Sequence, residues 1–200
     1  MEASQLLDDK PLRRTVLLVA LLNFGYFLVE FTVARLIGSV SLAADSIDFL
    51  EDASVNALIW AALGWSAVNR ARVGMVMAGF ILVPGLFTLW TAWEKINAPA
   101  APDYIPLSLA GFGALVVNFA CAFILARFRS HKGSLTRAAF LSARNDVIAN
   151  AAIIVVGLIT ALNRSAVPDL VVGLGIFLMN ADAARQVWKA ARSEIKQAKA

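Results

Sequence analysis

The chain of 200 residues has little charge, a single cysteine and a single histidine. Charged residues make up 16% of it and hydrophobic residues 60%, a balance that excludes an ordinary soluble domain. Cys121 alone cannot form a disulfide framework, and His131 alone cannot anchor a cluster of Cys and His metal ligands. The sequence also lacks a phosphate-binding loop and a nucleophile elbow. We therefore expect neither ATP-driven transport nor enzyme activity, and no cofactor.

The chain is instead rich in apolar runs of helical length. A helix needs ~20 mainly apolar residues to cross the hydrocarbon core of a bilayer. The sequence therefore predicts an all-α membrane protein with six transmembrane helices, over residues 15–37, 42–68, 73–96, 107–128, 135–162 and 170–188. We expect these helices to form a single transmembrane domain over residues 1–200, with no soluble C-terminal domain.

Lysine and arginine are distributed unevenly over this topology. They precede the first predicted helix, join the second to the third and the fourth to the fifth, and follow the sixth, whereas the alternate connections hold few. Because basic residues gather on the cytoplasmic side, both termini are predicted to face the cytoplasm from the plasma (inner) membrane. Topology and anionic lipid also explain the net charge of +4, so no nucleic-acid partner is expected.

The second predicted helix carries four acidic residues, Asp45, Asp48, Glu51 and Asp52. Ionisable side chains are costly in a membrane and usually face a bundle interior or a water-filled cavity. Asp48 and Asp52 lie on one face of a helix, where they repel each other unless a proton or cation lies between them. Asp45 belongs to the same broad face, whereas Glu51 points either to another helix or to the aqueous cavity.

The fifth predicted helix contains a further acid, Asp146, on the same pattern. Asp146 follows Ser142 by four residues and precedes Asn150 by four, as Asp52 precedes Asn56. Oxygen ligands from two facing helices suit a divalent cation. A carboxylate cage that is unstable when empty would alternate between loaded and protonated forms, which is the chemistry of a proton-coupled cation carrier.

Two other functions are compatible with the same residues. The acids could pair with buried bases such as Arg144 or cap helix starts, which would make the chain a non-transporting membrane scaffold. A carrier for a small organic cation could instead use cation–π surfaces from tryptophans. The tryptophans in question are Trp60, Trp65, Trp90 and Trp93.

Three segments resemble the cation diffusion facilitator (cation efflux) family. The second helix has its pattern in "GSVSLAADSIDFLED", which begins at Gly38 and contains an Asp-Ser pair before two ligand positions. The first helix has "NFGYFLVEFTVARLIGS", with Asn23, Tyr26 and Glu30 before the Gly-Ser turn, and the fifth has Asp146. The resemblance implies a secondary transporter that exports divalent metal (zinc, cadmium, manganese or iron class) from the cytoplasm by proton antiport, as a homodimer.

The resemblance also implies the ligands. Asp48, Asp52 and Asp146 would bind the metal, and Ser142 stands where the family has its fifth-helix histidine. The fourth ligand is then Ser142, Asn145, Asp45 or water. Without the imidazole, oxygen coordination favours manganese, iron or magnesium-like ions while still permitting zinc and cadmium.

Further residues are expected around this site. The possible second shell contains Asp45, Asn145, Asn150 and Glu30. Glu30 is either a proton carrier or a residue of the outer vestibule. Most members of the family also carry a soluble domain that supports dimerisation, so a dimer of this chain would depend on membrane contacts.

Overall fold

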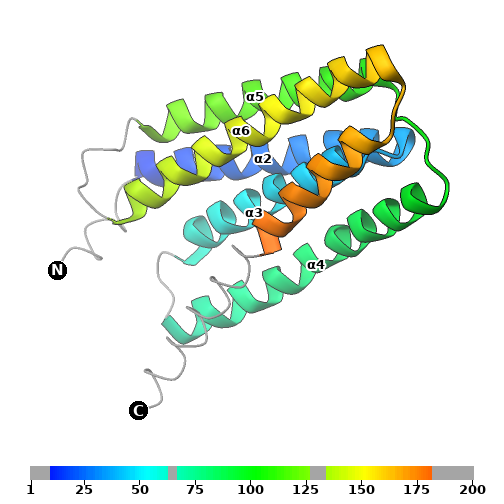
Figure 1. Ribbon diagram of the computed structural model, residues 1–200. Helices are drawn as coiled ribbons and strands as arrows, with labels where there is room; N and C mark the ends of the chain where they lie inside the picture. The colour runs from blue at the N-terminus through cyan, green and yellow to red at the C-terminus, as the bar shows by residue number, and fades with distance from the viewer. Residues whose placement is uncertain (1–9, 63–66, 127–133, 182–200) are drawn as a thin grey trace.

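The computed structural model describes residues 10–62, 67–126 and 134–181, and within them the backbone forms six helices and no strand (Figure 1). The first five are α2 (Lys10–Ile37), α3 (Val40–Ala62), α4 (Ala67–Asn97), α5 (Tyr104–Ala126) and α6 (Ser134–Asn163). The sixth covers Val167–Ala181. The all-α class and the six helices predicted from the sequence are both present.

The helices run back and forth along one axis, so that their ends meet at two ends of the bundle (Figure 1). At one end, α2 passes into α3, α4 into α5 and α6 into the last helix; we call this the turn end. Helices extend beyond the apolar runs that marked them, as α2 does by beginning at Lys10 rather than at residue 15. Hydropathy detects the part of a helix that is apolar, whereas the backbone continues through flanking polar residues that are good helix formers.

The connection between α2 and α3 is the tightest of the turns. Gly38 has a φ of 62°, which a residue without Cβ adopts readily, and the backbone N–H of Ser39 donates to the carbonyl of Ala34 at 3.0 Å. Ser39 then caps α3, because its hydroxyl accepts a hydrogen bond from the N–H of Leu42 at 3.2 Å. The sequence Ile-Gly-Ser thus ends one helix and starts the next.

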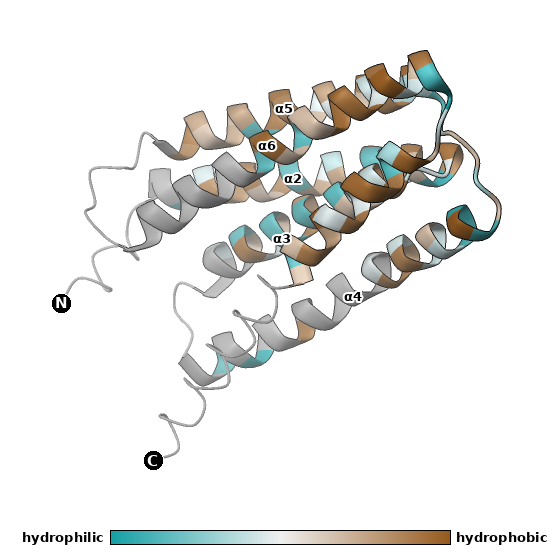
Figure 2. Ribbon diagram, viewed as in Figure 1, coloured by the Kyte–Doolittle hydropathy of each residue, from teal (hydrophilic) through white to brown (hydrophobic). Residues whose placement is uncertain are grey.

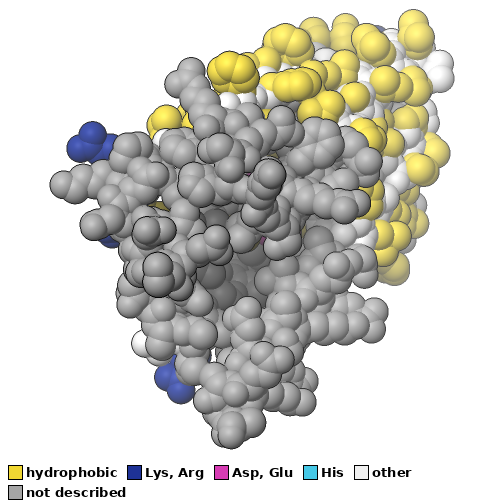
Figure 3. Space-filling model, turned by 90° about the vertical axis from the view of Figure 1, so that its left-hand side faces the viewer, with side chains coloured by type: hydrophobic (Ala, Val, Ile, Leu, Met, Phe, Trp, Pro, Cys, Tyr) yellow, Lys and Arg dark blue, Asp and Glu magenta, His cyan; other side chains and the backbone are white. Residues whose placement is uncertain are grey.

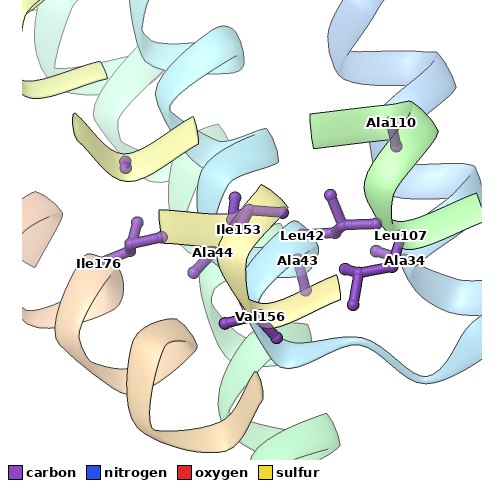
Figure 4. Close-up of a cluster of buried hydrophobic side chains, with 10 residues drawn as sticks. Ala34, Leu42, Ala43, Ala44, Leu107, Ala110, Ile153, Val156 and Ile176 are labelled. Carbon is purple, nitrogen blue, oxygen red and sulfur yellow. The ribbon is translucent and has the colours of Figure 1, made fainter. Parts of the chain in front are cut away.

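Small residues allow the helices to approach closely around one apolar core. The core residues point toward one another from α2, α3, α5, α6 and the last helix (Figure 4). They are Ala34, Leu42, Ala43, Ala44, Leu107, Ala110, Ala149, Ile153, Val156 and Ile176. A Cβ added at Gly157 would meet the side chain of Ser108, so the Ser108 side chain of α5 packs directly against the backbone of α6 at this glycine.

The outward faces are apolar as well. Hydrophobic residues follow one another along the described helices (Figure 2). Many large hydrophobic side chains are exposed, among them Leu36 at 80% and Leu162 at 84%. Seen from the end opposite the turn end, hydrophobic side chains cover the described flank and Lys and Arg side chains lie at the edge (Figure 3). By length and composition, three described helical segments can cross a membrane: Arg13–Ile37, Tyr104–Leu125 and Asp146–Asn163. The helix Val167–Ala181 is apolar but shorter.

Candidate cation site

The four acids of α3 divide into two environments. Asp45 is 1% exposed and faces the interior of the bundle. Asp48, Glu51 and Asp52 are each half-buried, one to two turns further along the helix. The acids at 48 and 52 share a face because one helical turn separates them. Partial exposure keeps this face within reach of water.

Asp146 of α6 lies across from this face. α3 and α6 are in contact, and the Asp146 carboxylate is close enough to Asp52 and Asp48 for mutual electrostatic repulsion. It is half-buried, like its two counterparts on α3. In the part of the chain that the structure describes, no group of three or more His, Cys, Asp or Glu side chains is arranged to hold a metal ion. The three carboxylates therefore form an electrostatic cluster, and their role as ligands stays a prediction.

The expected fourth ligand cannot be placed. Ser142 lies on α6 one turn before Asp146, and Asn145 directly precedes that residue, but the side chains of both lie outside the described residues. The same holds for Arg144, the base expected in the scaffold hypothesis. Within the described residues, neither Asp48 nor Asp52 forms a salt bridge.

The two Asp-Asn pairs have the same local geometry. The amide nitrogen of Asn56 donates to the carbonyl of Asp52, and that of Asn150 donates to the carbonyl of Asp146, each at 2.8 Å. This orientation leaves the amide oxygens free of the helix backbone. The Oδ1 atom of Asn150 is buried without a hydrogen-bond partner, so it is available to a ligand or to water.

Glu30 lies inside the bundle. It is fully buried, so it does not belong to an outer vestibule, and it is close enough to Asp45 of α3 for electrostatic repulsion. Neither oxygen of Glu30 has a conventional donor, and the Oδ2 atom of Asp45 has none either.

Tyr26 borders this pair without donating to it. Its hydroxyl donates to the carbonyl of Ala110 on α5 at 2.6 Å, and its ring packs on Phe49 with centroids 4.9 Å apart. A Cβ added at Gly113 would meet the Tyr26 hydroxyl, so this glycine makes room for the ring between α2 and α5. Tyr26, one of the first-helix residues of the family resemblance, therefore packs at the α2–α5 contact.

The sequence interpretation missed Asp169, which is the most highly connected buried acid. It is fully buried at the turn end, where its Oδ2 atom accepts from Lys95 Nζ at 2.7 Å and from the Val40 N–H at 2.9 Å. Its Oδ1 atom accepts from the Ser39 hydroxyl at 2.7 Å and from the hydroxyl and N–H of Ser41 at 2.6 and 3.1 Å. The carboxylate thus sits at the N-terminus of α3, where free N–H groups and the helix dipole favour an anion.

This network, which we call the Asp169 network, joins three helices. It ties the start of α3 to the end of α4 through Lys95 and to the start of the last helix. Gly173 makes the approach possible, because a Cβ there would meet the backbone of Val40 and Ser41. In the sequence, Lys95 is the second-last residue of the predicted helix 73–96, and Asp169 directly precedes the predicted helix 170–188. The sequence did contain a signal for this pair, because it places a base and an acid at the ends of two predicted helices on the same side of the membrane.

Comparison with known protein families decides the identity. The cation efflux transmembrane domain matches residues 16–195 of the chain. The chain belongs to the cation efflux family. This confirms the resemblance and, with the six helices, the fold class of a cation efflux transmembrane domain. A search of curated proteins finds no match.

Membership defines the function in general terms. Cation efflux proteins are membrane transporters that move cations, so the broad prediction of a cation exporter is supported and an enzyme is not expected. The apolar outer faces agree with a location in a membrane.

Proposed function

We propose that this cation efflux protein exports a divalent metal ion from the cytoplasm in exchange for protons. The observation that carries the proposal is the placement of Asp48 and Asp52 on one face of α3 with Asp146 across from them on α6. The three carboxylates repel one another, and a divalent cation would relieve that repulsion. Their partial exposure allows an ion to reach them.

The donor set favours hard cations. Asp48, Asp52 and Asp146 offer carboxylate oxygens, Ser142 would supply a hydroxyl oxygen, and water completes the shell. Oxygen donors suit manganese, iron and magnesium-like ions, and zinc and cadmium also bind carboxylates. The Oδ1 atom of Asn150 adds an acceptor close to Asp146. Asp45 is 1% exposed and lies deeper in the bundle than the half-buried Asp48 and Asp52, so we place it behind the ligands rather than among them.

Release of the ion requires that its charge be replaced. When the metal leaves, the carboxylates again repel one another, and protons neutralise them in its place. Metal and protons would therefore occupy the site alternately. A carrier that returns in the protonated form exchanges one for the other.

Orientation and assembly follow from charge and surface. The exposed Arg13, Arg14 and Arg72 lie near helix ends opposite the turn end. At the turn end, Arg35 and Arg164 are exposed, whereas Lys95 is buried in its pair with Asp169. The sequence places most of the other Lys and Arg residues in the connections and termini of the opposite end. The positive-inside rule then directs the turn end away from the cytoplasm, with both chain termini cytoplasmic and the plasma (inner) membrane as the location. We further propose a homodimer that forms through lipid-facing helices.

Transport in proteoliposomes tests the proposal. We expect Asp52→Ala and Asp146→Ala each to abolish uptake of the preferred divalent ion driven by a proton gradient. Glu94→Ala, which removes an exposed acid of α4, is the matched control and should transport as the wild type does. Full transport by both site variants would show that the site is elsewhere.

Two observations bear on the alternative functions. The Lys95–Asp169 pair is an acid–base helix pair of the kind a scaffold would use, but it lies at the turn end and leaves the acids of the cluster without a basic partner among the described residues. Trp90 and Trp93 are each 60% exposed on α4. Metal should raise the melting temperature of a transporter and leave that of a scaffold unchanged. Competition of divalent metals for transport would exclude an organic-cation carrier.

A further inference from the structure

A hollow lies on the outer face of α2, close to the turn end. It has a volume of about 340 Å³ and is lined by Phe31, Thr32, Arg35 and Leu36. Arg35 and Leu36 are exposed, and both belong to the last turn of α2. Since the chain belongs to a family of membrane transporters and its outer faces are apolar, this hollow opens toward lipid.

The guanidinium of Arg35 is held in place by aromatic rings. Its central carbon lies 5.5 Å from the centroid of the Phe87 ring of α4, and Phe31 meets the same ring edge-on, with centroids 5.0 Å apart. Contact with a ring face leaves the in-plane N–H donors of a guanidinium free. Among the described residues, Arg35 forms no salt bridge. The hollow therefore has a positioned positive charge without an anion.

Exposed aromatic side chains place Arg35 at the level of the lipid headgroups. Trp90 and Trp93 near the end of α4 are each 60% exposed, and Tyr104 at the start of α5 is 42% exposed. Tryptophan and tyrosine concentrate at the boundary between hydrocarbon and headgroups. Arg35 is two residues from the end of α2 at the same end of the bundle. A lipid phosphate lies at this depth, and a guanidinium binds it through two parallel hydrogen bonds.

An apolar surface continues from the hollow along α2. Phe31 stacks on Phe27 with centroids 5.5 Å apart, and Phe27 contacts Phe24 at 6.1 Å. Phe24 and Leu28 are 46% and 50% exposed on this helix. From Arg35 to Phe24 the helix rises roughly 16 Å, which is close to half of a hydrocarbon core about 30 Å thick. The surface is thus long enough for one acyl chain.

We propose that this hollow binds an anionic glycerophospholipid, with its phosphate on Arg35 and an acyl chain along α2. The backbones of α2 and α4 are not in contact among the described residues, and the two helices meet here through Phe31, Arg35 and Phe87. The lipid would fill this junction. A second copy of the chain fits less well, because a two-fold interface centred on the hollow would bring two Arg35 side chains together.

Native mass spectrometry of the full-length protein tests the proposal. The probes are phosphatidylglycerol, which is anionic, and phosphatidylcholine, whose phosphate is neutralised by its own ammonium group. Arg164→Gln, which removes another exposed arginine at the turn end, is the matched control for Arg35→Gln. We expect the wild type and Arg164→Gln to bind one phosphatidylglycerol in preference to phosphatidylcholine. Arg35→Gln should bind it on the order of tenfold more weakly, because a charge-assisted hydrogen-bond pair is lost.

The other occupants of the hollow give different results. Equal binding of phosphatidylglycerol by the wild type and Arg35→Gln would overturn the proposal, as would a wild type without preference between the two lipids. Displacement of the lipid by inorganic phosphate would assign the charge to a free anion instead. A lipid-free wild-type dimer that Arg35→Gln converts to a monomer would assign the hollow to a second copy.

A second variant keeps the test decisive if Arg35→Gln does not fold. Arg35→Lys retains the charge but loses the planar fork of donors, so it should also bind phosphatidylglycerol more weakly than the wild type does. An affinity of Arg35→Lys equal to that of the wild type would then overturn the proposal.

Discussion

The Nζ atom of Lys95 and the Oδ2 atom of Asp169 are 2.7 Å apart, although 74 residues separate them in the chain. The pair is buried, with side chains 5% and 0% exposed. It holds the end of α4 against the start of the last helix, and the serines at the start of α3 share the same carboxylate. At the turn end, one buried carboxylate therefore accepts hydrogen bonds from both α3 and α4. The first two predictions follow from this arrangement.

Removing either partner of the pair should destabilise the protein strongly. In Lys95→Met the carboxylate stays buried without its cation, and in Asp169→Asn the ammonium stays buried without its anion. Loss of one member of a buried ion pair costs about 3–5 kcal/mol of unfolding free energy. Chemical unfolding of the purified protein measures this loss. Glu94→Gln, next to Lys95 but exposed, should change the stability by less than about 0.5 kcal/mol; an equal effect of all three variants would contradict the prediction.

The hydroxyl groups of Ser39 and Ser41 should each contribute to the stability of the protein. Ser39→Ala removes a hydroxyl that donates to Asp169 and caps α3, whereas Ser41→Ala removes a hydroxyl that donates to Asp169 but does not cap the helix. A hydrogen bond to a charged group contributes about 1.5–3 kcal/mol, so each variant should lose stability on this order, Ser39→Ala more. Thr32→Ala, whose exposed hydroxyl donates only to its own helix, is the matched control in the same unfolding measurement. If Ser39→Ala left the free energy of unfolding unchanged, that result would contradict a capping role for Ser39.

Tyr26 and Gly113 should be energetically coupled. Gly113→Ala places a methyl group against the Tyr26 hydroxyl and forces the ring to move, which should cost about 1–3 kcal/mol of stability. Tyr26→Phe removes the hydroxyl and its bond to Ala110, at about 1 kcal/mol. In the Tyr26→Phe background, Gly113→Ala should be much less harmful, as a double-mutant cycle of unfolding free energies will show. Gly175→Ala, where a Cβ meets nothing within 4 Å, serves as the control.

Ser142→His should change the choice of metal. The substitution puts an imidazole one turn before Asp146, at the position where the family resemblance implies a histidine. Imidazole suits zinc better than manganese, so the ratio of zinc to manganese affinity should rise by on the order of tenfold, which corresponds to ~1.4 kcal/mol. Titration calorimetry with a panel of divalent ions gives this ratio. An unchanged ratio would place residue 142 outside the coordination shell.

The fold was predictable from the sequence because apolar length is a local property. Residues 107–128, for example, predicted a helix that the structure has at Tyr104–Ala126. The acids of α3 could also be found in the sequence, since charged residues stand out in an apolar run. The residues that each acid contacts could not be predicted. Asp169 and Lys95 come together only when the ends of two helices meet, and neither residue interrupts an apolar run.

The same reason explains the interpretation of Glu30. Its spacing from Asn23 gave the helix face but not what lies opposite that face. Only the packing of α2 on α3 places Asp45 against it and excludes the outer vestibule. Contacts between helices depend on rotation and crossing angle, which single-helix patterns do not specify.

The acids of α3 also affect how the protein reaches the membrane during synthesis. With four carboxyl groups in 23 residues, α3 is absent from the segments apolar enough to cross a bilayer on their own, whereas the preceding α2 is among them. One aspartate at the centre of a nascent segment raises the apparent free energy of membrane insertion by about 2.5–3.5 kcal/mol. Integration of α3 therefore depends on α2 already being in place, where Glu30 and the Tyr26 ring offer its polar face a surface other than lipid. The two helices must enter the bilayer as one hairpin, and the Gly-Ser turn is the point about which that hairpin closes.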